Sequence, residues 1–160
     1  MRGEHILALA IFALAACSKS KRAQVDGDSS FTRLQQRGET AMGVDQYTSG
    51  HVFEPLTDGG RIVLQRNQSD SAGEATIRAH MSAIATAFSE GDFTIPGFVH
   101  AMSDVPGTQV MKKLRAEISY SAHELPRGGE VRITTRNPDA IAAIHEFLAF
   151  QRTDHRAGMH

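Results

Sequence analysis

Two matching stretches of this chain decide its fold. The first reads Leu56-Thr57-Asp58-Gly59-Gly60-Arg61-Ile62-Val63-Leu64, and the second reads Leu125-Pro126-Arg127-Gly128-Gly129-Glu130-Val131-Arg132-Ile133. In each stretch a Gly-Gly pair precedes apolar residues that alternate with polar ones, and paired glycines supply the positive φ of tight hairpin turns. We therefore predict two β-hairpins that turn at Gly59, Gly60, Gly128 and Gly129, each burying one face of its strands.

A helix pattern follows each hairpin. After the first, Ser71 and Glu74 have the spacing of a capping box, and Gly91 marks the end of the helix. After the second, Asn137 and Pro138 predict an N-cap and a first helical residue. Residues spaced at 3.6 per turn give each helix one apolar face, and these residues are Ile77, Met81, Ile84 and Phe88, then Ile141, Ile144 and Leu148.

The two halves are related by a shift of 69 positions, which takes Leu56 to Leu125 and Ile62 to Val131. This repeat predicts an α+β fold with pseudo-two-fold ββαββα order. A four-stranded antiparallel sheet would be covered on one face by two helices. The alternative is that two unrelated hairpin–helix units share the same turn chemistry.

The N-terminus carries a second signal. An apolar run from Ile6 to Ala16 is about half the 20 residues that span a bilayer, and it ends in Leu14-Ala15-Ala16-Cys17. This ending resembles the lipobox of bacterial lipoproteins, in which the cysteine is acylated. The resemblance implies a signal peptide over residues 1–16, lipidation of Cys17 and, with Ser18 next, an outer-membrane location facing the periplasm. The alternative is a plain signal peptide with an incidental cysteine.

Composition divides the rest of the chain. Residues 17–50 are polar and show no sustained period, so we predict a flexible linker there. We expect residues 51–156 to form a single α+β domain and residues 157–160 to form a C-terminal tail. The formal net charge of −1 excludes the basic surface that nucleic-acid binding requires.

Histidine is the unusual component, with 8 in the chain. Imidazole and thioether groups bind transition metals. We predict a copper or zinc site from the two helical histidines, a histidine–methionine pair in the long connector, and a histidine near the C-terminus, namely His80, His145, His100, Met102 and His155. The alternative is that these histidines are half-buried core residues, because none has the short spacing typical of metal ligands.

Catalytic motifs are missing from the sequence. It contains no Gly-x-Ser-x-Gly, no phosphate-binding loop, and no cysteine for a Cys–His pair once Cys17 is lipidated. We therefore predict no enzyme, but an envelope lipoprotein that binds a ligand. The alternative is a structural or assembly module that contacts a protein partner or a second copy through the open sheet face or Phe150.

Four segments of the chain resemble a family of small exported bacterial proteins without established function. They are Gly59-Gly60-Arg61-Ile62, Ile77-Arg78-Ala79-His80, Pro96-Gly97-Phe98-Val99-His100 and Phe147-Leu148-Ala149-Phe150-Gln151-Arg152. The resemblance covers about residues 50–156. Some members carry the name aspartate carbamoyltransferase, which does not fit this chain because it lacks two α/β domains and a Ser-Thr-Arg-Thr phosphate loop. The resemblance implies no active-site residues.

Overall fold

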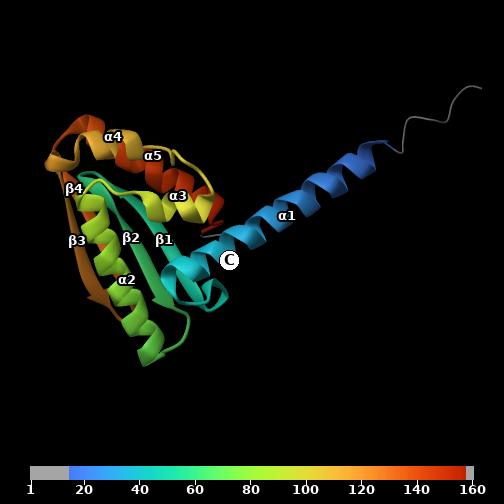
Figure 1. Ribbon diagram of the computed structural model, residues 1–160, viewed down its shortest axis with the longest axis horizontal. Coiled ribbons are helices and arrows are strands. Elements are labelled where there is room, and N and C mark those ends of the chain that lie inside the picture. The colour runs from blue at the N-terminus through green and yellow to red at the C-terminus, as the bar shows by residue number, and fades with distance from the viewer. Residues whose placement is uncertain (1–14, 158–160) are drawn as a thin grey trace, which may run out of the picture.

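The structure, a computed structural model, describes residues 15–157, with side chains from residue 29 onward except that of Gln46. Four antiparallel strands form one sheet in the order β1-β2-β4-β3, and α2 and α5 pack on the same face of it (Figure 1). The predicted α+β class and four-stranded sheet are confirmed. The elements are α1 (Ala15–Met42), β1 (Ser49–Leu56), β2 (Gly59–Arg66), α2 (Ser71–Ser89), α3 (Thr94–His100), α4 (Thr108–Lys113), β3 (Ile118–Leu125), β4 (Gly128–Thr135) and α5 (Pro138–Asp154), with 3-10 turns at Gln46–Thr48 and Arg115–Glu117.

The 69-residue shift is also the symmetry of the sheet. In the central pair of strands Ile62 lies opposite Val131, which is its equivalent in the repeat. Gly59 pairs with Thr134 at one end of these strands, and Gln65 pairs with Gly128 at the other end. The shift of 69 positions turns the first pair into the second, so the strand pairing has the symmetry of the repeat. The pseudo-two-fold axis therefore passes between β2 and β4.

Each helix covers the hairpin of the other half. Helix α2 follows the first hairpin but packs on β3 and β4, whereas α5 follows the second hairpin and packs mainly on β1 and β2. The predicted apolar stripe of α2 is buried, from Ile77 to Phe88. In α5 the side chain of Asn137 caps the helix by accepting hydrogen bonds from the N–H groups of Asp139 and Ala140. These crossed helices hold the two halves together.

The four glycines do not form the turns, which corrects the prediction from sequence. Leu56 pairs with Gly59 and Leu125 with Gly128, so Thr57-Asp58 and Pro126-Arg127 are the two-residue links. Only Gly59 of the four has a positive φ, of 137°. The others serve close packing: a Cβ on Gly128 would collide with the Leu64 carbonyl, one on Gly60 with Leu148, and one on Gly129 would press on the His123 carbonyl.

The predicted linker over residues 17–50 is also corrected, because α1 and the start of β1 occupy it. Contacts with distant parts of the chain hold the second half of α1 in place. Leu34 and Met42 are buried, the Arg37 Nε–H donates to the Val99 carbonyl over 2.7 Å, and Arg156 lies 4.2 Å above the Phe31 ring. The folded unit therefore begins within α1 rather than at residue 51. None of the described helices is both long and apolar enough to cross a membrane.

We predict that Gly128→Ala destabilises the protein by about 2 kcal/mol, because the new methyl group must displace β2 backbone. The matched control is Gly50→Ala in β1, where the nearest atom to the added Cβ is 4.0 Å away. Urea denaturation measures both variants. Equal stability of the two variants would contradict the close-packing role of Gly128.

Candidate ligand pocket

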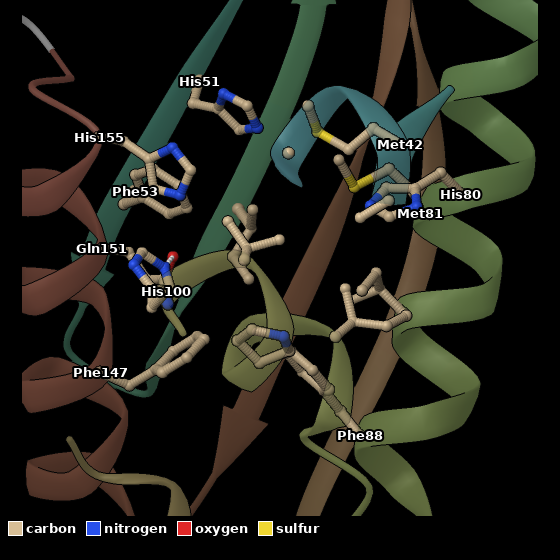
Figure 2. A pocket seen from close by; sticks show the side chains of 17 residues that line it. Met42, His51, Phe53, His80, Met81, Phe88, His100, Phe147, Gln151 and His155 are labelled. Atoms are coloured by element: carbon tan, nitrogen blue, oxygen red, sulfur yellow. Dashed lines mark hydrogen bonds between the residues drawn. The ribbon is translucent and has the colours of Figure 1, made fainter. Parts of the chain in front are cut away.

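A pocket lies on the helix-covered face of the sheet, between α2 and α5. Its cavity has a volume of about 70 Å³. The last turns of α1 and the short helix α3 contribute to its wall, and Figure 2 shows side chains from these elements pointing into it. We call it the histidine pocket, and its lining includes Ala41, Met42, His51, Phe53, His80, Met81, Ile84, Phe88, Ile95, Val99, His100, Phe147, Gln151 and His155.

Four histidines from four segments meet in this wall. His51 comes from β1, His80 from α2, His100 from the last turn of α3, and His155 directly follows α5 (Figure 2). The ring centroid of His155 lies 5.1 Å from that of His51 and 5.1 Å from that of His100. His51 and Phe53 are two residues apart on β1, so their side chains lie on the same face of the sheet. Their rings stack there with centroids 5.5 Å apart.

His100 is the anchored member of this group. Its side chain is fully buried, its Nδ1 lies 2.5 Å from Oδ2 of Asp154, and its Nε2 lies 2.8 Å from Oε1 of Gln151. Both partners lie on α5, so these two bonds fix α3 against α5. Because both ring nitrogens are engaged, His100 has no free nitrogen to offer a metal.

Two polar atoms in the wall have no hydrogen-bond partner. They are Nε2 of Gln151, a residue only 4% exposed, and Nδ1 of His155. Gln151 and His155 are four residues apart on or next to α5, so their side chains share a face. Buried polar groups are almost always satisfied, and each unmade bond costs about 1–3 kcal/mol. An unpartnered pair of this kind indicates a place where a bound molecule completes the hydrogen bonding.

The pocket keeps the imidazoles of His51, His80 and His155 uncharged. Burial, followed by repulsion from His80, lowers the pKa of His51 to about 4. Burial lowers the pKa of His155 to about 2, with further contributions from His51 and His100, and burial also lowers the pKa of His80. These three rings are therefore neutral at pH 7. Among the described residues that line the pocket, none is Asp, Glu, Lys or Arg.

The predicted metal set is only partly brought together. His80, His100 and His155 line the pocket, but His145 lies at the first hairpin, where its Nε2 is 2.9 Å from the Leu56 carbonyl oxygen and 3.0 Å from that of Gly59. Met102 is 40% exposed and lies outside the pocket. In the described part of the chain no group of three His, Cys, Asp or Glu is arranged to hold a metal ion. The structure therefore does not bring His80, His100 and His145 together in one centre.

His51 and Gln151 are the polar residues of the pocket that were not predicted from the sequence. The alternation of His51 with Phe53 on one strand face is the signal that would have found the first. Phe150, considered from sequence as a contact for another chain, packs edge-on against His100 at 4.8 Å and is partly buried. Cys17 lies on α1, and its side chain is outside the described ones.

Stability should depend on pH through His51 and His155. Their pKa values are about 4 and about 2 in the folded protein against 6.5 in the unfolded chain. Above pH 6.5 both are neutral in either state, and stability is at its full value. As the pH falls below 6.5, the unfolded chain takes up protons that the folded chain excludes. The free energy of unfolding then drops by about 1 kcal/mol per pH unit for each histidine.

Urea denaturation at pH 7.5 and pH 5.0 measures this loss. The double variant His51→Phe, His155→Phe should lose less stability between the two pH values than the parent chain. His123→Phe, at an exposed position on β3, should retain the parent's pH dependence. A double variant with unchanged pH dependence would show that these two histidines are not held neutral by the fold.

Comparison with known proteins adds no further constraint. No protein-family model matches this chain, and no curated protein or solved structure matches it. The resemblance to small exported bacterial proteins stays a prediction.

Proposed function

We propose that this protein is a non-catalytic lipoprotein of the bacterial envelope that binds a small ligand in the histidine pocket. The observation that carries the proposal is the pair of unpartnered polar atoms, Gln151 Nε2 and His155 Nδ1, in a mainly apolar wall. A concave apolar site with a few convergent polar groups is the usual form of a small-molecule site.

The anchor is Cys17, acylated after removal of residues 1–16, which holds the chain at the outer membrane on its periplasmic side. Helix α1 then connects the anchor to the pocket, because it contains residue 17 and ends at Met42 in the pocket wall. At a rise of about 1.5 Å per residue, the helix between these two positions is about 37 Å long. A helical stalk thus takes the place of the flexible tether that composition suggested.

The surface favours ligand binding over the alternative of an assembly module. The open face of the sheet carries charged side chains, with Arg61 Nε 2.6 Å from Glu54 Oε2 and Arg61 Nη1 3.5 Å from Glu130 Oε2. An assembly module would instead need a contiguous apolar patch there. Four described histidines line the pocket, whereas His123 lies on the open face opposite Glu130, and the four in the pocket also support a ligand site.

Lipidation is tested by labelling cells with radioactive palmitate and separating their membranes. The parent chain should incorporate the label and sediment with the outer membrane, because Cys17 supplies the acylated residue. Cys17→Ala should lose the label and appear in the soluble periplasmic fraction. Ser18→Asp should keep the label but move to the inner membrane. A Cys17→Ala chain that stays labelled would contradict the anchor.

Ligand binding is tested by screening small fragments against the mature chain and following its backbone amide NMR signals. Fragments that bind should shift the signals of Gln151 and His155. Ala41→Leu should weaken this binding at least tenfold, because residue 41 lines the cavity. Thr40→Leu is the matched control, since Thr40 is exposed on the same helix and does not line the pocket.

Zn²⁺ and Cu⁺ belong in the same screen, because copper or zinc was the ligand expected from sequence. A saturable metal effect on His51 and His155 would keep the protein a ligand-binding one and make a metal its ligand. If neither fragments nor metals act on the pocket, or if binding fragments shift only the open sheet face, the ligand-binding proposal is wrong.

A further inference from the structure

We infer that the histidine pocket takes a small, uncharged, mainly apolar molecule that carries one hydroxyl-like polar group. This inference rests on the proposed function, because it names the class of ligand for the same site. It follows from three properties of the wall, namely its charge, its unpartnered atoms and the distribution of its apolar surface.

The charge of the wall excludes ligands that carry a carboxylate or ammonium group. The described lining contains no Asp, Glu, Lys or Arg, and its free imidazoles are neutral. The nearby carboxylate of Asp154 is already engaged with His100. A carboxylate or ammonium group that left water for this pocket would therefore find no opposite charge, and burying an unpaired charge is far more costly than burying a dipole.

The two unpartnered atoms select the polar group. One end of the Gln151 carboxamide faces Nε2 of His100, and the other end has no partner. If His100 donates from both ring nitrogens, the free end is the Nε2–H₂ donor; if His100 donates only to Asp154, the amide turns over and its free end is the Oε1 acceptor. His155 Nδ1 either accepts or donates, according to the tautomer. A hydroxyl group both donates and accepts, so it pairs with the amide and with either form of the imidazole. A group that only accepts, such as a ketone, pairs with only one orientation of the Gln151 amide and only one tautomer of His155.

The apolar part of the ligand has a separate place. Phe88 and Phe147 line the cavity together and pack edge-on at 5.8 Å, and Ile84, Ile95 and Val99 extend the same wall. Because Phe147 and Gln151 are also four residues apart on α5, the apolar wall and the polar atoms follow one another along one helix face. A molecule with an apolar ring and a hydroxyl at one end fits this order.

Three probes that share a fluorobenzene ring test the inference by ¹⁹F NMR titration at pH 7. They are 4-fluorophenol, fluorobenzene and 4-fluorobenzoate. We expect 4-fluorophenol to bind about fivefold more tightly than fluorobenzene, as one added net hydrogen bond provides. The benzoate should bind at least tenfold more weakly than the phenol.

The variant Gln151→Met removes the amide while keeping the length of the side chain. It should abolish the advantage of 4-fluorophenol over fluorobenzene, and continued binding of fluorobenzene would show that the pocket remains intact. Gln109→Met, at an exposed position on α4, is the matched control and should keep the phenol preference.

The outcomes separate this inference from the proposed function. If fluorobenzene and the phenol bind equally, or if the benzoate binds as tightly as the phenol, the pocket is a ligand site and the class inferred here is wrong. If none of the three binds and the fragment screen also fails, the proposed function itself is wrong. A phenol preference that Gln151→Met leaves unchanged would also overturn the inference.

Discussion

The pairing of Ile62 with Val131 across the two central strands is the contact on which the rest of the structure depends. It joins the two ββα halves at equivalent residues, so each helix is carried over the hairpin of the opposite half. Two helices laid on one face of a four-stranded sheet leave a groove between them. The groove must be filled by large side chains or closed by other segments.

The chain closes this groove with elements that break the symmetry. Helix α1 precedes the first half, and α3 and α4 are inserted only between α2 and β3. Equivalent strand positions have also diverged, since His51 pairs with Leu64 in the first hairpin and Tyr120 pairs with Ile133 in the second. Tyr120 packs edge-on against Phe88, whereas His51 lines the pocket. The site therefore exists on one side of the pseudo-two-fold axis, where α1 and α3 add their residues.

The hairpins and their helices were predictable because their signals are local. These signals are the alternation of apolar and polar residues around Ile62, the apolar face of α2 that ends at Phe88, and the N-cap of α5 at Asn137. Each depends only on residues close to it in the sequence. Helix α1 was not predictable in this way, because its described part is ordered by distant partners such as Val99 and Arg156. The predicted grouping of His145 with His80 and His100 failed for a related reason. Helical spacing placed His145 near an edge but gave no sign that its ring would bond to the Leu56 and Gly59 carbonyl groups.

The central claim is that the fold gathers neutral imidazoles in a pocket withdrawn from water. The most direct measurement is a pH titration of the histidine ring ¹⁵N chemical shifts. The account predicts that His155 stays neutral throughout the range from pH 7 to pH 4.5, and that His51 reaches half-protonation only near pH 4. Titration of both rings near pH 6.5, the value of a solvent-exposed histidine, would contradict it.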